Sequence, residues 1–138
     1  MPSPSPILVY VIGAGSVFLG IHCFLRPEVE YRRFGLPLEP AHRQKHNTGD
    51  EEYASPVIHL KGIRETTYGL ALGALQYHGY DGAVTIMTAV MSLAGLGDGI
   101  VVWLYGGDEA RGKAFGHWGA FAALAGLFLW RTYGDVHG

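Results

Sequence analysis

Charged residues that could carry acid–base chemistry lie inside otherwise apolar segments: Lys61, Arg64, Glu65 and Asp98. An ionisable side chain in such a segment is costly, so it faces the interior or a wet cavity and marks function by default. Two carboxylates with an arginine can supply a base and an acid, because the arginine keeps one ionised while desolvation keeps the other protonated. We assign Asp98 as the base, Arg64 as its orienting partner and Glu65 as the acid. The alternative is separate structural pairs, such as Lys61 with Glu65 at i, i+4.

Helical geometry puts more side chains on the faces that carry these charges, since successive residues are about 100° apart. Tyr68 shares an arc of about 100° with Lys61, and Met91 shares a face with Asp98. His117 opens the last apolar segment, at the same level as the charges. The expected substrate-binding residues are Lys61, Tyr68, His117, Met91 and Phe121.

Four long apolar segments must position these residues. The first, Ile7–Leu25, carries no Asp, Glu, Lys or Arg, and is long enough to cross a bilayer core of about 30 Å. The last three are joined by short connections, which make antiparallel neighbours. We predict one all-α domain over residues 1–138, a transmembrane up-down four-helix bundle with a long polar loop between helices 1 and 2. The expected spans are 7–25, 57–77, 82–105 and 113–130, and the loop is 26–56.

The polar loop is expected to contain one short helix. Pro27 followed by Glu28 and Glu30 suits a first helical turn, and Gly35 suits its end. Beyond Pro37 we expect irregular chain, either a solvated linker or a cover over one mouth of the bundle.

Small residues predict how the helices pack. The spacing of Gly69 with Gly73, and of Gly95 with Gly99, allows close helix approach. On the fourth helix a small-residue face lies opposite His117, and on the second helix an apolar face points to lipid. The expected packing face is Gly112, Gly116, Gly119 and Ala123, and the expected lipid face is Ile63, Leu70 and Ala74.

Positive charges predict the orientation. With four spans, seven Lys and Arg residues share the side of the long loop, and only Arg131 lies on the other, as part of an aromatic and cationic interface anchor. The positive-inside rule then makes the loop cytosolic and puts both termini on the opposite side. The expected location is the endoplasmic reticulum membrane.

Composition excludes several function classes. The chain has 138 residues, 49% hydrophobic and 16% charged, with a net charge of −2 and no basic run, so no nucleic-acid footprint is present. One cysteine, Cys23, excludes an intramolecular disulfide framework. His42 and His46 have helical ligand spacing but fall in the loop, so a metal enzyme is the third choice. We expect neither a metal nor a cofactor.

Short motifs resemble a family of small four-span fungal membrane proteins described as a domain of unknown function. The motifs are residues 34–37, 61–65 and 97–101, together with His117 at the head of the last helix, and the likeness covers about Ile7 to Trp130. The resemblance implies a place in fungal biosynthetic clusters, with epoxide opening in polyketide pathways for some members. The family usually has Asp after the arginine, whereas this chain has Glu65.

The leading hypothesis is therefore a cofactor-independent membrane enzyme that opens an epoxide on a lipophilic small molecule, by hydrolysis or cyclisation, in fungal polyketide or terpenoid biosynthesis. The alternative is a noncatalytic lipid-binding or transporter-like protein, whose polar cluster binds a ligand or relays protons. Expected partners are the lipophilic substrate, the lipid bilayer and a second copy of the chain in a homo-oligomer. Self-association would favour the carrier, and turnover would favour the enzyme.

Overall fold

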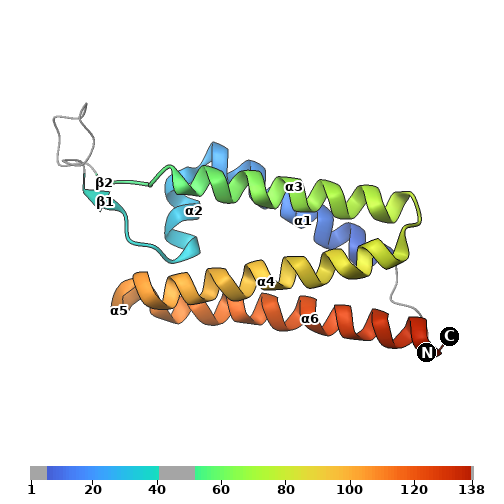
Figure 1. Cartoon of the computed structure of the whole chain (residues 1–138). Coiled ribbons are helices and arrows are strands. Elements are labelled where there is room, and N and C mark those ends of the chain that lie inside the picture. Colours follow the sequence, from blue (N-terminus) through green and yellow to red (C-terminus); the bar gives the residue numbers. More distant parts are fainter. Residues whose placement is uncertain (1–5, 41–51, 138) are drawn as a thin grey trace.

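Four long helices dominate the computed structural model, which describes residues 6–40 and 52–137 (Figure 1). The expected apolar segments are all helical, and the last helix continues past Trp130. The long helices are α1 (Pro6–Leu25), α3 (Val57–Tyr77), α4 (Asp81–Tyr105) and α6 (Ala114–His137). The short elements are α2 (Pro27–Phe34), β1 (Glu39–Pro40), β2 (Glu52–Tyr53), α5 (Gly107–Ala110) and a 3-10 turn, η2 (Arg111–Lys113). Strands β1 and β2 pair antiparallel, with Glu39 opposite Tyr53.

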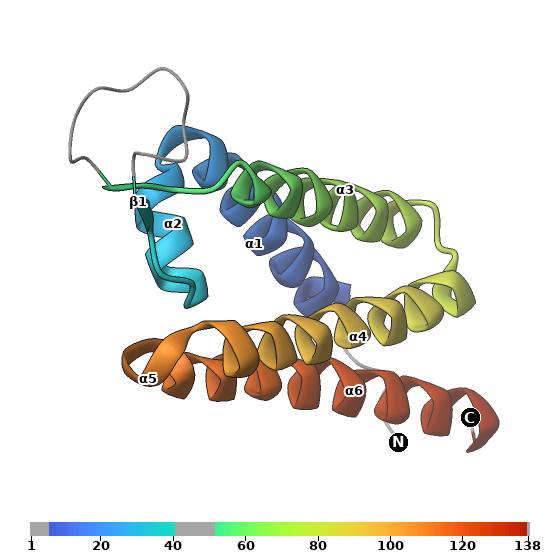
Figure 2. The same cartoon turned by 60° about the vertical axis from the view of Figure 1, so that its left-hand side comes forward.

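The long helices associate in two antiparallel pairs, α1 with α3 and α4 with α6 (Figures 1 and 2). The pairs converge where α3 turns into α4 and share a core there, formed by Val9, Leu72, Val84 and Met91. The all-helical expectation is confirmed. Backbone-close packing within each pair is far more extensive than the contact between the pairs.

Glycines set the contact between α1 and α3. A Cβ on Gly20 would meet the carbonyl oxygen of Gly62 at 2.7 Å, and a Cβ on Gly69 would meet the carbonyl oxygen of Gly13. Gly73 takes part through its backbone, because its nitrogen lies 3.6 Å from a Cβ built on Gly13, although a Cβ on Gly73 itself would meet no described atom within 4 Å. The predicted Gly69–Gly73 pair therefore lies at the close contact with α1, where Gly69 has no room for a side chain and Gly73 has. The contact also uses Gly62, seven residues before Gly69.

On α4, both predicted glycines contact α6. A Cβ on Gly95 would lie 3.2 Å from the backbone nitrogen of Phe121, and the Trp118 ring lies against Gly99. The predicted packing face of α6 is wrong. No described atom lies within 4 Å of a Cβ built on Gly112, Gly116 or Gly119, and Ala123 is exposed. The helix instead packs its bulky face against Gly95 and Gly99 of α4.

Helix α2 begins at Pro27 and ends before Gly35, as predicted; Gly35 has a φ of 108°, which favours glycine. Its C-terminal end is held by α6 and the preceding turn, since the Lys113 ammonium donates to the carbonyl oxygen of Arg32 and His117 Nε2 lies 2.8 Å from that of Phe34. The loop prediction for residues 41–51 falls outside the described residues.

Helix α2 is tied to α1 by a carboxylate that the sequence did not single out. Glu30 is 3% exposed, and its Oε1 lies 2.7 Å from His22 Nδ1 and accepts a hydrogen bond from Arg33 at 3.0 Å. In the sequence Glu30 looks like an ordinary first-turn acid. Because α2 contacts α1 and α3 and, through Phe34, His117 of α6, it spans the end at which the pairs diverge (Figure 2).

Arg131 is not an exposed interface anchor. Its side chain is 7% exposed, and Nε donates to the Thr85 hydroxyl at 3.0 Å while Nη2 lies 3.3 Å from Asp81 Oδ1. The prediction is wrong because the start of α4 offers acceptors on the face that packs against the end of α6. The neighbouring Trp130 and Tyr133 are exposed.

Two of the described helices are long and apolar enough to cross a membrane. They are α1, with a mean hydropathy of 2.1, and α4, with 1.6. Only 22% of the apolar window of α1 and 33% of that of α4 are buried. Ile63 and Leu70 on α3 are also exposed, as expected for the predicted lipid face.

Candidate functional site

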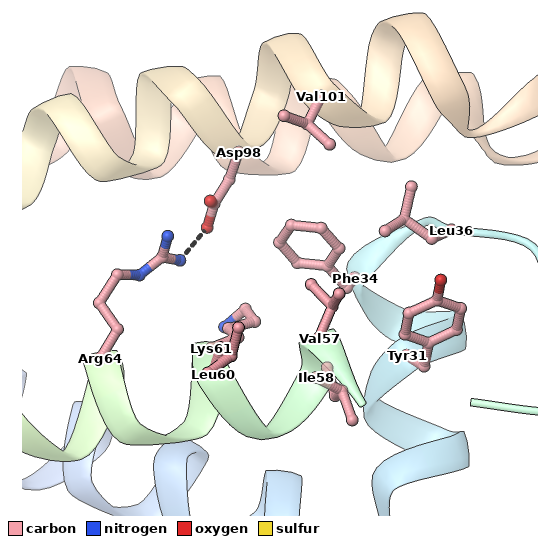
Figure 3. A pocket seen from close by; sticks show the side chains of 10 residues that line it. All are labelled: Tyr31, Phe34, Leu36, Val57, Ile58, Leu60, Lys61, Arg64, Asp98 and Val101. Atoms are coloured by element: carbon pink, nitrogen blue, oxygen red, sulfur yellow. Dashed lines mark hydrogen bonds and ion pairs between the residues drawn. The ribbon is translucent and has the colours of Figure 1, made fainter. Parts of the chain in front are cut away.

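A cavity of about 300 Å³ lies between α3 and α4, and α2 forms one of its ends (Figure 3). Most of its wall is apolar or aromatic. Residues of this wall include Tyr31 and Phe34 from α2, Val57 and Leu60 from α3, and Val101 from α4. Its charged lining residues are Lys61, Arg64 and Asp98, all of which the sequence had singled out. An apolar cavity with a few convergent polar groups is the usual form of a small-molecule site.

Arg64 and Asp98 join the two helix pairs across the cavity. Arg64 Nη2 donates to Asp98 Oδ2 at 2.5 Å, which Figure 3 marks with a dashed line. The Arg64 and Asp98 side chains are 30% and 13% exposed. Arg64 lies two turns into α3 and Asp98 two turns before the end of α4, so antiparallel packing brings them to the same level. The structure thus brings into contact the two residues that the sequence analysis paired.

Glu65 lies behind this pair and contacts two cations. Its Oε1 accepts hydrogen bonds from Lys61 Nζ at 3.3 Å and from Arg64 Nη2 at 3.5 Å. Glu65 is not among the described residues that line the cavity. Lys61, Arg64, Glu65 and Asp98 thus form one cluster with two positive and two negative charges. The predicted Lys61–Glu65 pair exists as part of this shared cluster.

Phe34 connects the cluster to α6, although the sequence analysis did not assign it a role. Lys61 Nζ lies 5.6 Å from the centre of its ring, and the His117 ring packs edge-on against it at 4.8 Å. Arrangements of this kind are typical of cation–π and aromatic pairs. In the sequence, Phe34 could have been noticed because it directly precedes Gly35, the residue that ends a short helix. His117 therefore holds the wall of the cavity and is not itself one of the described lining residues.

A protein-family profile matches residues 13–131, which include every residue of the charged cluster. The chain belongs to DUF4267, a domain of unknown function. No curated protein and no solved structure matches it. The expected membership of a family of unknown function is thereby confirmed.

Three other expected substrate-binding residues of this DUF4267 chain lie elsewhere in the fold. Met91 is 5% exposed within the core shared by the two helix pairs, and Tyr68 packs against that core. The backbone of Phe121 lies beside Gly95. None of the three is among the described residues that line the cavity. Tyr68 lies one turn beyond Arg64 and Met91 two turns before Asp98, whereas Phe121 belongs to α6, none of whose described residues lines the cavity.

Possible metal ligands are the His, Cys, Asp and Glu side chains among the residues of this DUF4267 chain that the structure describes. These residues include no group of three or more such side chains arranged to hold a metal ion. His42 and His46, the alternative ligands, lie outside the described residues. Cys23 is buried and its thiol is free.

Proposed function

We propose that this protein is an integral membrane enzyme whose four long helices all cross the bilayer. The support is the apolar surface that the helices turn outward. Large side chains on all four are at least 60% exposed, including Phe18, Leu70, Ile86 and Leu129. Such a surface in water would be a liability, whereas in a bilayer it is the ordinary lipid face. In this proposal the long loop is cytosolic and the membrane is that of the endoplasmic reticulum.

The proposed reaction is acid–base opening of an epoxide on a lipophilic small molecule, by hydrolysis or internal cyclisation. One observation carries it, namely the Arg64–Asp98 pair in an apolar-walled cavity. Asp98 takes the proton of the attacking water or hydroxyl, whose oxygen forms a bond to one epoxide carbon. The bond between that carbon and the epoxide oxygen breaks, and the oxygen is left as an alkoxide. Arg64 holds Asp98 in place, as expected for a charge-assisted hydrogen bond.

The proton for the alkoxide comes from Lys61 in this proposal. The sequence analysis assigned this role to Glu65, but Lys61 lines the cavity, while Glu65 accepts hydrogen bonds from Lys61 and Arg64. Glu65 then positions the Lys61 ammonium. After the reaction, the proton on Asp98 returns to Lys61 through water or the product, so the cycle needs no other reactant.

A panel of lipophilic epoxides, incubated with the purified protein in vesicles with product detection, tests the proposal. Asp98→Asn should abolish turnover and leave the helical content unchanged, because the amide keeps the shape and removes the base. Asp108→Asn is the matched control, since its side chain is 99% exposed and outside the cavity. Adding Glu65→Gln to Asp98→Asn should cost little more, since residues that act as a unit are not additive. Wild-type turnover per folded molecule in Asp98→Asn would refute the catalytic assignment.

One observation favours the second candidate function, a noncatalytic lipid-binding or carrier protein. The four charges of the cluster pair with one another and sum to zero without a ligand, which a binding site needs no proton transfer to maintain. A carrier of this size would work as an oligomer. Displaceable binding of lipophilic molecules by an oligomer, with no product from any epoxide, would decide for the carrier.

A further inference from the structure

The cavity is open on one side, along the line where α3 and α4 face each other; we call this line the α3–α4 seam. Leu60 and Val101 line the cavity, yet they are 65% and 40% exposed. On α3, Leu60 and Gly62 lie about 100° to either side of Lys61, and Gly62 is packed against α1. Helix α1 thus covers the side of α3 on which Gly62 lies, and the side on which Leu60 lies stays uncovered.

Helix α4 shows the same arrangement. Gly99 lies about 100° to one side of Asp98 and Val101 about 60° to the other. Gly99 is packed against Trp118 of α6, so α6 covers its side. Because α3 and α4 are antiparallel, the uncovered sides of both helices face the same way. The opening between Leu60 and Val101 therefore faces away from both partner helices, where lipid surrounds the protein.

The volume of the cavity limits how much of a ligand it encloses. At about 30 Å³ for each water-sized group, 300 Å³ holds about ten non-hydrogen atoms. A longer molecule with its reactive end at Arg64 and Asp98 must therefore leave the cavity. The exposed apolar flank offers its chain a continuous path into the bilayer.

The charge balance of the cluster determines which polar end group, or head, of a ligand the cavity favours. Two cations and two anions sum to zero, so an anionic or cationic head would bring an uncompensated charge into an apolar cavity. The Lys61 ammonium and the Arg64 guanidinium line the cavity, and with three and five N–H groups they carry more donors than the hydrogen bonds to Glu65 and Asp98 use. Such a site suits a neutral oxygen acceptor, such as an ether, epoxide, carbonyl or hydroxyl oxygen.

We infer that the ligand is a neutral, oxygen-headed lipophilic molecule that reaches the cavity sideways from the bilayer, between Leu60 and Val101. Its head lies at Arg64 and Asp98, and its chain extends outward past these two side chains. The inference rests on the proposed membrane location and deepens the proposed function, since it names the substrate class and the access route.

Photolabelling of the full chain in phosphatidylcholine vesicles tests this route without requiring turnover. The probe is a sixteen-carbon primary alcohol with a diazirine near the middle of the chain, and excess 1-hexadecanol reveals the displaceable label. We expect this label on residues 57–64 and 97–104. Leu60→Trp should lower it by about ten-fold or more, because the indole fills the opening, whereas Leu70→Trp, at an equally exposed site on α3, should not. Val101→Trp repeats the test from the other helix in case Leu60→Trp does not fold.

An alkyl sulfonate with the same chain and diazirine tests the head. It should give about ten-fold less displaceable label than the alcohol. Equal labelling by the sulfonate would overturn the neutral head, and displaceable label unaffected by both tryptophan variants would overturn the access route. Label in the expected place without turnover of any epoxide upholds the route and refutes the enzyme. Turnover without displaceable label in the two ranges upholds the enzyme and refutes the access route.

Discussion

The backbone contact between α1 and α3 orients Arg64 toward Asp98, and two glycines of α3 test it as a matched pair. A Cβ on Gly69 would meet the carbonyl oxygen of Gly13 and lie 2.8 Å from the backbone nitrogen of Val17. A Cβ on Gly73, one turn later, would meet no described atom within 4 Å. Gly69→Ala and Gly73→Ala therefore make the same chemical change on one helix, in contact and out of contact.

The expected magnitude follows from two terms. Each alanine gains about 0.5–1 kcal/mol over glycine within a helix, and this term cancels when the two variants are compared. Gly69→Ala also forces apart two backbones that cannot yield like a flexible side chain, and overpacking of this kind costs about 1–3 kcal/mol. Gly73→Ala should thus be about 0.5–1 kcal/mol more stable than the wild type. Gly69→Ala should be about 1–3 kcal/mol less stable than Gly73→Ala.

Reversible unfolding in mixed micelles, with far-ultraviolet circular dichroism as the readout, measures both free energies on the full chain. Gly69→Leu should enlarge the loss, because a longer side chain separates α1 from α3 further. Equal free energies of unfolding for the two alanine variants would refute the close contact between these helices, and with it the orientation of α3 that brings Arg64 to Asp98.

Two more predictions concern orientation and the ion pair. Cysteines placed at Ser3 and at Thr48 in a cysteine-free background should react with a membrane-impermeant maleimide from opposite faces of sealed vesicles. The seven-to-one excess of Lys and Arg predicts that the loop and the N-terminus lie on opposite sides. Reaction from one face would contradict four spans. Arg64→Lys should lose turnover of the epoxide panel, because the rigid guanidinium places Nη2 between Asp98 and Glu65, whereas a lysine ammonium is a point charge on a flexible stem. A wild-type rate in this variant would show that Arg64 does not orient Asp98.

The pairing of Arg64 with Asp98 could be predicted because depth along a helix is proportional to residue number. Once the ends of α3 and α4 are known, antiparallel packing leaves little freedom in the level at which their charges lie. The four long helices and α2 were predictable for a similar reason, since apolar length, Pro27 and Gly35 are local signals. Epoxide opening, the lipophilic substrate and the fungal pathway remain predictions.

Other features depended on which helix packs against which, and the sequence pattern does not show this. The face of α6 with Gly116 and Gly119 has the composition of a packing face, yet α6 turns its bulky side to α4. Arg131 resembles an interfacial anchor until the start of α4 supplies its acceptors. Phe34 becomes a cavity residue only because α2 folds back across the open end of the two pairs.

The sequence by itself determined which segments are helical and how far along each helix the charged residues lie. It also indicated that Arg64, Glu65 and Asp98 are neighbours. These features follow from helix length and periodicity, which are properties of a single segment. Only the tertiary structure decided that Glu65 lies behind the cavity while Lys61 lines it, and that one flank of the α3–α4 seam stays open. Those features depend on the rotation of each helix about its axis. That rotation is set by the glycine contacts between Gly13 and Gly69, between Gly20 and Gly62, and between Gly99 and Trp118, and so by which helices become partners.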